Sequence, residues 1–532
     1  LIGTIPVGLA VCGFEAYNIT KLTTNLGFEI YHKIKNKNHL APSTSKLNYD
    51  KYLKNCPKNY EWDNKIAGVI ALEDPPHTFK LKKEMIENAE QEILISGSYC
   101  GRAAFDEILD AIEKRMEERP NLRVSILSSK RFITNSKQYK SANWDKIKNL
   151  TKKYPDRFFM TITYESSQNN PYDNEFKYIS NHTKLMIVDR KVMITGGSGI
   201  EDRWMSQNGL EDMLSLEEKS KLNTNQLQKN VPKESFVNAS IARAFRDKDF
   251  LFYSNNNESI IESSALEFYK LMTRWHHFES TVMKKDVKVK EIAAQRGKEH
   301  KLNNFHDFYK PIEVKKARIN VNNLDIKRDE ICKPKQCKFF ATGPELKHNY
   351  LEDEIVNLFK NAKKNIVINH MYFHPTQAVF KALVGALKRN VKITVITNQY
   401  NRKSPRSHKA FAPRTLSFLH RLNKFQNKNQ DDLKVYCWDK ELVTNHQKVI
   451  VVDDNYVLCG SSNFSYKGLN SMSDYEHNVL VESPELCENL KKSFDKDLKV
   501  CKKINKKELS KRLSLHDHLL TWIHEKSEKR IG

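Results

Sequence analysis

The chain contains 532 residues, of which 39% are hydrophobic, and it carries a formal net charge of +24. This length excludes one small domain and suits two fused α/β halves of about 200 residues each. The positive charge favours anionic partners, namely a membrane surface, a phospholipid headgroup or nucleic acid, without choosing among them.

Residues 1–62 form an N-terminal segment that is first apolar and then basic. Its opening stretch, residues 1–13, is shorter than the about 20 residues that a membrane-spanning helix needs. A truncated signal, an anchor and a helix packed on the following domain all remain open, and we favour the packed helix.

The first predicted half covers residues 63–280 and contains the pattern His182-x-Lys184 followed by Asp189. Residues 184–195 consist of two short apolar runs around a charged break, which predicts two buried strands joined by a tight turn. Side chains two positions apart on a strand point to the same face, so His182 and Lys184 can converge on one anion. Asp189 lies at the turn, where its carboxylate can anchor backbone N–H groups, and we interpret it as structural first.

Two polar stretches follow the first pattern. The segment between Trp204 and Phe236 is predicted to loop out near the mouth of the site. Residues 281–337 are rich in lysine and poor in apolar periodicity, which predicts a linker on the surface. Contact of this linker with acidic lipid is the alternative.

Residues 338–500 form the second predicted half, in which His446, Lys448 and Asp453 repeat the first pattern in the same setting. Within this half, residues 398–414 are basic, contain proline and follow a strand-like run. Because loops after the carboxyl ends of strands bind ligands in α/β sheets, this stretch is predicted to be a loop that either recruits a phosphorylated headgroup or is simply solvated. The cations concerned are Arg402, Lys403 and Arg406.

Residues 501–532 are basic and carry leucines near helical spacing, which predicts a C-terminal helix. A position in the membrane interface is compatible with this pattern, but docking on the second half is favoured.

The duplication carries the functional argument. One His-x-Lys before a strand is usually a surface accident, whereas two copies with matching flanks indicate a single site with two histidines. Imidazole can act as nucleophile or proton donor near neutral pH, and ammonium groups hold phosphate charge. The alternative is a degenerate protein that binds phosphate without turnover.

No metal is predicted. The nine cysteines lack framework spacing, and the close pair Cys332 and Cys337 has no partner pair for a zinc site. Mostly reduced thiols are expected, and two histidines with two lysines need no cofactor for proton transfer and charge stabilisation.

These motifs resemble the phospholipase D superfamily, whose hallmark is the duplicated pattern, and the resemblance covers roughly residues 65–280 and 338–500. Further matching positions are Gly196, Gly197, Gly460, Ser461, Asn463 and the acidic Glu476. For the acidic residue of the first half, Asp249 is chosen over Asp247. The sequence departs from the family at Gly199, where asparagine is usual, so the first half lacks one donor, for which Arg203 is a candidate substitute.

The resemblance implies two α/β halves, related by a pseudo-twofold axis, with the active site at their interface. It implies that His182 attacks phosphorus to give a phosphohistidine and that His446 protonates the departing alcohol. Lys184, Lys448 and Asn463 would hold the non-bridging oxygens, while Asp249 and Glu476 would orient the histidines.

Three activities compete. The preferred one is a phospholipase D that hydrolyses glycerophospholipids to phosphatidic acid, with transfer to alcohols as a side reaction. The alternatives are a phosphatidyltransferase of the cardiolipin-synthase kind and a nuclease; a lipid-binding module without activity is the least favoured. The expected partners are phospholipid and an anionic membrane surface. We expect a monomeric bacterial protein, either peripheral to a membrane or secreted.

Overall fold

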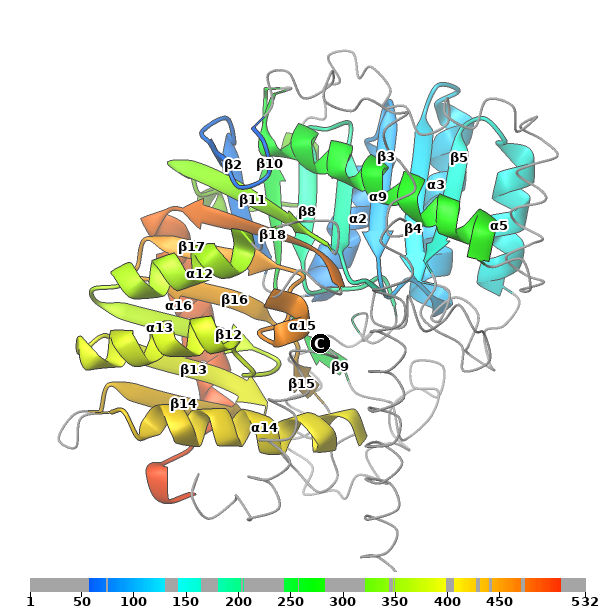
Figure 1. Cartoon of the computed structure of the whole chain (residues 1–532). Coiled ribbons are helices and arrows are strands. Elements are labelled where there is room, and N and C mark those ends of the chain that lie inside the picture. Colours follow the sequence, from blue (N-terminus) through cyan, green and yellow to red (C-terminus); the bar gives the residue numbers. More distant parts are fainter. Residues whose placement is uncertain are drawn as a thin grey trace, which may run out of the picture.

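The computed structural model describes residues 57–72, 75–129, 142–163, 180–201, 204, 244–256, 258–282, 321–343, 348, 350–398, 406–426, 431–439, 443–469 and 474–508. These residues form two α/β halves, each with one large sheet, which meet along the centre of the molecule (Figure 1). The predicted fold of two related α/β halves is confirmed.

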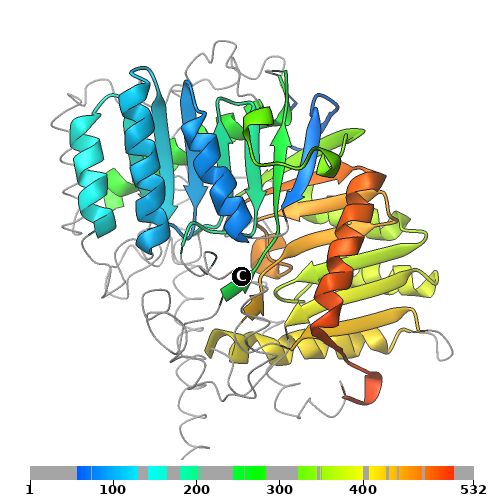
Figure 2. The ribbon, with the colours of Figure 1, turned by 180° about the vertical axis from the view of Figure 1, so that it is seen from behind.

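The first half is built on a seven-stranded sheet. Its strands, in sheet order, are β2 (Gly68–Leu72), β10 (Asp249–Tyr253), β8 (Val192–Gly196), β7 (Lys184–Val188), β3 (Glu92–Gly97), β4 (Arg123–Ser129) and β5 (Phe158–Thr163). The helices α2 (Pro75–Glu87), α3 (Arg102–Glu118) and α5 (Ala142–Lys153) cover one face, which is turned toward the viewer in Figure 2. The long helix α9 (Ile260–Val282) crosses the other face (Figure 1).

The second half repeats this strand order and adds strands at both edges. Its strands, in sheet order, are β1 (Trp62–Asp63), β11 (Gln336–Thr342), β18 (Asp474–Glu482), β17 (Tyr456–Gly460), β16 (Lys448–Val452), β12 (Asn365–His370), β13 (Lys392–Asn398), β14 (Leu433–Trp438) and β19 (Cys501–Lys503). The helices α12 (Tyr350–Asn361), α13 (Gln377–Lys388) and α14 (Arg406–Asn423) cover one face, and α16 (Pro484–Lys499) lies on the other (Figures 1 and 2). The short elements are α15 (Tyr466–Leu469) and the 3-10 turns η5 (Val321–Asn323) and η6 (Arg328–Glu330).

The two motif aspartates make equivalent contacts and so show which positions of the two halves correspond. The Asp189 carboxylate accepts the backbone N–H groups of residues 90–92 at 2.7–2.8 Å, and Asp453 accepts those of residues 363–365 at 2.7–3.2 Å. Both aspartates have positive φ, of 48° and 55°, at the first of the three residues that connect the paired strands. Asp and Asn tolerate this conformation better than most residues, which explains the residue type at the turn. Each aspartate therefore ties a strand turn to the segment between a helix and a strand, α2 and β3 in the first half and α12 and β12 in the second.

A shared core fills the space between the two sheets. It contains Phe252 and Phe268 from the first half and Phe339 and Val479 from the second, all 0–1% exposed. Separate apolar cores lie under the outer helices of each half. Because the sheets bury apolar surface against each other, the position of one half is tied to that of the other.

The predicted loop at residues 398–414 is partly wrong. Arg406 begins α14, and Pro413 lies inside that helix. A proline removes one backbone donor and disfavours a helix interior, but the buried Leu416, Leu419 and Leu422 support helix beyond it. Arg402 and Lys403 lie outside the described residues.

Several other predictions fall on residues that the structure does not describe. They concern residues 1–56, the segment after Trp204, the part of the predicted 281–337 linker that covers residues 283–320, and the tail after residue 508. The rest of that linker contains η5, η6 and the start of β11. The strand β19 belongs to the second sheet, so this half continues past residue 500. Among the described cysteines all are free thiols, and Cys332 and Cys337 are both buried.

Candidate active site

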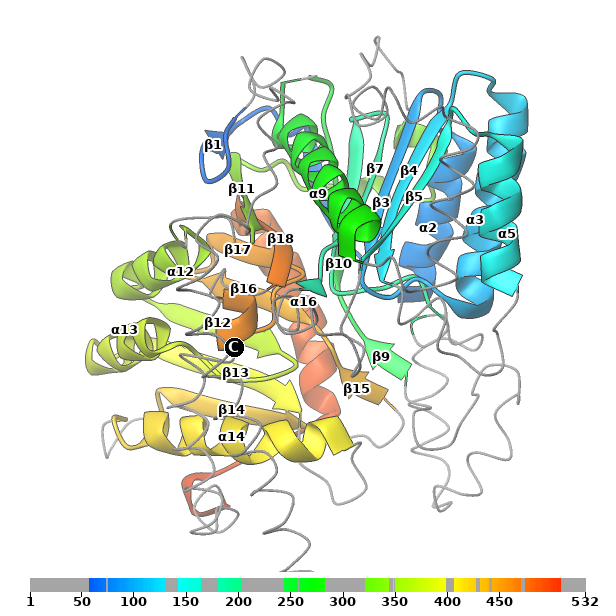
Figure 3. The same cartoon turned by 45° about the vertical axis from the view of Figure 1, so that its right-hand side comes forward.

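Two strand pairs cross between the halves and bring the motif histidines to one place. The strand β6 (Ser180–Asn181) pairs in parallel with the start of β18, and β9 (Ala244–Arg246) pairs in parallel with β15 (Val443–Asn445), as Figure 3 shows for the second pair. In each pair, one strand leads into a motif histidine and the other into an acidic residue of the opposite half. The crossing therefore sets each histidine beside a carboxylate from the other half.

His182 is held in one tautomer by two neighbours. Its Nδ1 lies 2.9 Å from Oε1 of Glu476, and its Nε2 lies 3.2 Å from Nζ of Lys184. A carboxylate accepts a hydrogen bond from the protonated Nδ1, and an ammonium group donates a hydrogen bond to Nε2, so Nε2 carries the lone pair. The Ser461 hydroxyl donates to Oε2 of Glu476 at 2.5 Å, which fixes the carboxylate in turn.

His446 also lies between a carboxylate and the lysine of its own motif, but this lysine is nearest to Nδ1. Its Nδ1 lies 2.6 Å from Oδ2 of Asp247, and Nζ of Lys448 lies 3.0–3.3 Å from its two ring nitrogens. The indole Nε1 of Trp204 donates to the same Asp247 oxygen at 3.0 Å. Trp204 thus fixes Asp247 as Ser461 fixes Glu476.

The structure places Asp247, rather than the predicted Asp249, against His446. Asp249 is the first residue of β10, and its Oδ1 accepts the backbone N–H of Ser198 at 3.0 Å instead. A side chain at Gly197 would place its Cβ 1.9 Å from Oδ1 of Asp247, so the glycine makes room for the carboxylate. The duplicated segments DKDFLF (247–252) and EHNVLV (476–481) align Asp247 with Glu476, and this internal comparison was the available signal.

The neighbours of Asp247 are anchored in the protein interior. Arg246 forms a buried ion pair with Asp497 of α16 at 3.1 Å, and the buried Lys248 donates to the hydroxyl of Ser493 on the same helix. Since both flanking side chains are fixed by α16, Asp247 has little freedom to leave His446.

Burial shapes the protonation of the site. Desolvation, followed by repulsion from Lys184, holds the pKa of His182 well below its ordinary value. Burial raises the pKa of Glu476 to about 7 and that of Asp247 to about 6, in each case against the attraction of nearby lysines. Burial lowers the pKa of Lys448 to about 7. The site therefore contains a neutral His182 and several groups that exchange protons near neutral pH.

The expected phosphate donors differ between the halves. In the second half, Oδ1 of Asn463 is buried without a hydrogen-bond partner among the described residues. In the first half, a Cβ at Gly199 would lie 2.6 Å from Cβ of Tyr99, so Tyr99 occupies the space that an asparagine would need. Arg203, the expected substitute, lies outside the described residues.

Aromatic rings and one further carboxylate complete the site, and sequence reasoning missed all of them. The rings of Trp204 and Phe245 lie 5.6 and 4.8 Å from the ring of His446. Asp474, on β18, acts on His182 electrostatically and raises its pKa against the effect of burial. Their positions depend on the crossing strands and therefore leave no local signal in the sequence.

The ligand atoms of His182, Asp474 and Glu476 lie within 4.8 Å of one another, a spacing that a metal ion could use. Lys467 already forms an ion pair with Asp474 at 3.1 Å, and Lys184 and Lys448 also act on His182. A divalent cation would therefore meet repulsion from three ammonium groups. The residues present fit anion binding better than cation binding.

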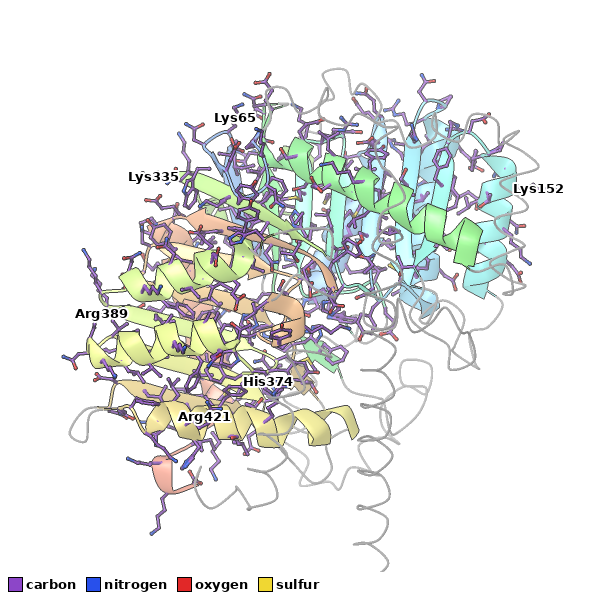
Figure 4. All side chains as sticks on the ribbon, viewed as in Figure 1. Lys65, Lys152, Lys335, His374, Arg389 and Arg421 are labelled. Atoms are coloured by element: carbon purple, nitrogen blue, oxygen red, sulfur yellow. The ribbon has the colours of Figure 1, made fainter. Side chains whose placement is uncertain are left out.

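Basic side chains are also found away from this site. Figure 4 labels Lys65, Lys152, Lys335, Arg389 and Arg421 at the periphery of both halves. Among the described residues no helix is both long and apolar enough to cross a membrane.

Known proteins resemble this chain in sequence and in fold. A family model described as "Cardiolipin synthase, PLD-like domain" matches residues 83–230 and 355–498, which contain both histidine motifs. A cardiolipin synthase of Clostridium perfringens is 25% identical over 203 residues, and a probable cardiolipin synthase, YwiE, of Bacillus subtilis is 24% identical over 165 residues.

These alignments cover 38% and 31% of this chain and only 38% and 30% of the two relatives. The crystal structure of a phosphatidylserine synthase from Haemophilus influenzae Rd KW20 superposes with a TM-score of 0.53 at 16% identity, covering 90% of this chain and 96% of that one. At this identity the likeness concerns the fold alone.

Proposed function

The chain belongs to the family described as cardiolipin synthase, PLD-like domain, and on that premise we propose that it is a phosphatidyltransferase. It would move a phosphatidyl group from one phospholipid to a hydroxyl group of a second lipid. The observation that carries the proposal is the pair of His–Lys sets, each completed by a carboxylate from the opposite half.

Transfer replaces hydrolysis as the preferred activity. The curated relatives named above are cardiolipin synthases, and no contact in the described site favours water over an alcohol as acceptor. The same residues can activate either molecule, so hydrolysis to phosphatidic acid is the competing outcome of the test. A bacterial membrane surface is the proposed place of action.

The first step uses the lone pair on Nε2 of His182. It attacks phosphorus while the bond from phosphorus to the leaving alcohol oxygen breaks, and His446 gives its proton to that oxygen. The His182 side chain is 15% exposed and that of His446 is 6% exposed, which supports His182 as the group that meets phosphorus. The proton on Nδ1 stays hydrogen-bonded to Glu476, which stabilises the positive charge that the ring acquires.

The second step reverses the roles of the same groups. His446, now neutral, takes the proton of the incoming hydroxyl, and the oxygen attacks the phosphohistidine. The bond from phosphorus to Nε2 breaks, which restores neutral His182. Lys184, Lys448 and Asn463 stabilise charge on the non-bridging oxygens in both steps. No cofactor is needed.

The test is product analysis with purified protein and vesicles that contain phosphatidylglycerol. Cardiolipin and free glycerol are expected; phosphatidic acid as the sole lipid product would contradict transfer and indicate a hydrolase. Intact lipid together with cleavage of single-stranded DNA in a parallel reaction would indicate a nuclease. His182→Ala should abolish both activities. The matched control is His77→Ala, at a half-buried histidine whose ring is hydrogen-bonded to the Asp325 carbonyl, and it should retain activity.

A further inference from the structure

The two halves differ in charge directly behind the active site. Since Asp189 and Asp453 accept equivalent backbone groups, α2 and α12 can be aligned without gaps, and Lys82 falls opposite Ile355. Three further buried positions match in this alignment, namely Thr78 with Leu351, Met85 with Leu358 and Ile86 with Phe359, whereas the buried Leu81 falls opposite the half-buried Glu354. Lys82 is only 4% exposed, so the first half has a buried ammonium where the second half has a core isoleucine.

The adjacent strand carries the complementary difference. Asp249 is paired with Gly196, and Asn478 is paired with Gly460 in the same way. The Asn478 amide donates to the Ser462 hydroxyl at 2.7 Å and accepts the Ser462 backbone N–H at 3.2 Å. In the second half this pair is neutral, and both atoms of the amide are used.

The first half lacks one of these two hydrogen bonds, the one between the side chains. Oδ1 of Asp249 accepts the backbone N–H of Ser198 at 3.0 Å, but Oδ2 and the Ser198 hydroxyl have no hydrogen-bond partner among the described residues. Asp249 is 1% exposed and Ser198 is 3% exposed. An unpaired carboxylate oxygen at this depth is costly unless another group satisfies it.

Lys82, Asp249 and Ser198 line the same small cavity, together with Lys184 and Gly199. Its size suits about one water molecule, and its lining offers a donor and two acceptors for it. Lys82 makes no ion pair with any residue in the described ranges, and its charge acts on Asp249 across this space. The first half thus has the buried base Lys82 and the buried acid Asp249 where the second half has the neutral Ile355 and Asn478. Either charged residue without the other would be an uncompensated buried charge.

We propose that Lys82 and Asp249, bridged by a water in this cavity, position the Ser198–Gly199 turn and Lys184 against the phosphoryl group. The inference rests on the proposed function and deepens it. Because Tyr99 leaves no room for a side chain at residue 199, the first half can present only backbone there. The position of that backbone depends on the bond from Ser198 to Asp249. The two residues are positioning residues, and they replace the asparagine side chain that the second half has at Asn463.

The test introduces the residues of the second half at the two corresponding positions of the first half. Lys82→Ile and Asp249→Asn are made singly and together, with Lys83→Ala as control, because Lys83 lies on the same helix in an exposed ion pair with Glu107. Each single variant should lower kcat at least about tenfold, since it leaves a buried charge that shifts the turn, while KM changes less than about twofold. The double variant should recover to within about threefold of the native kcat, and the control should match the native protein.

Native kcat in both single variants would overturn the proposal, and so would a double variant whose loss equals the product of the two single losses. Circular dichroism at the assay temperature separates loss of fold from loss of positioning.

All variants are also assayed on a chromogenic phosphodiester, bis(4-nitrophenyl) phosphate, and titrated with orthovanadate, which needs no turnover. If the native protein fails to make cardiolipin, the proposed function fails. The effect of the pair on ester cleavage or vanadate affinity then still decides this inference.

Discussion

Replacing Asp247 by asparagine tests whether its carboxylate supports His446. The side chain keeps its size and its place beside His446, but the ring loses the charged acceptor that lies 2.6 Å from Nδ1. A hydrogen bond to a charged group contributes about 1.5–3 kcal/mol, so kcat should fall about 10- to 160-fold. The loss falls on kcat because His446 acts by giving and then taking a proton in the two chemical steps.

Stability should respond in the opposite direction. Burial raises the pKa of Asp247 to about 6 in the folded protein, above its value of 3.8 when exposed. The folded state therefore binds this proton more tightly, and ionisation lowers stability as pH rises from about 4 to 6. At pH 7 the neutral asparagine removes that cost, so the thermal midpoint of the variant should equal or exceed that of the native protein.

The assay measures kcat and KM for cardiolipin formation, with thermal unfolding at pH 7 in parallel. Asp325→Asn, at an exposed carboxylate paired with Lys80, is the control for charge. Because Asp247 is argued to act through His446, adding the substitution to His446→Ala should cause little further loss. More than half of the native kcat in Asp247→Asn, or full additivity with His446→Ala, would refute the assignment.

Three further predictions concern the other groups. The His446→Ala variant should still release nitrophenol once per site from bis(4-nitrophenyl) phosphate, because a good leaving group needs no acid; no burst above the rate of His182→Ala would contradict this division of roles. Burial lowers the pKa of Lys448 to about 7, so its ammonium is lost as pH rises and kcat/KM should decline above about pH 7. Lys448→Arg should move that decline to higher pH, and an unchanged profile would exclude Lys448 as the titrating group. Asp189→Ala should lower the free energy of unfolding in urea by at least about 3 kcal/mol, because it strips three backbone donors of their acceptor. Asp453→Ala should cost less, since its donors are more exposed and water can replace the carboxylate.

The sequence predicted the features that depend on local periodicity. The apolar runs after each motif lysine correspond to β7, β8, β16 and β17, and the turn aspartates anchor backbone donors. The double occurrence of one pattern was enough to expect a shared site.

What could not be predicted depends on pairing between distant strands. Asp247 faces His446 because β9 pairs with β15, a contact between residues about two hundred positions apart in the sequence. Strand alternation within DKDFLF did not distinguish Asp247 from Asp249, because residues 247 and 248 lie between β9 and β10 rather than in either strand. Tyr99 and Trp204 likewise reach the site only through tertiary packing. At α14, the loop signal from Pro413 was overridden by the helical burial of the leucines that follow.

The crossing of carboxylates between the halves has a consequence for the covalent intermediate. Glu476 contacts His182, the proposed nucleophile, and Asp247 contacts His446, the proposed acid, in each case from the opposite half. Any movement that separates the halves removes both supports at the same moment. If the halves separated, His182 and His446 would therefore lose their carboxylates together, and under the proposed mechanism the uptake of a phosphatidyl group and its transfer to the acceptor would be lost together.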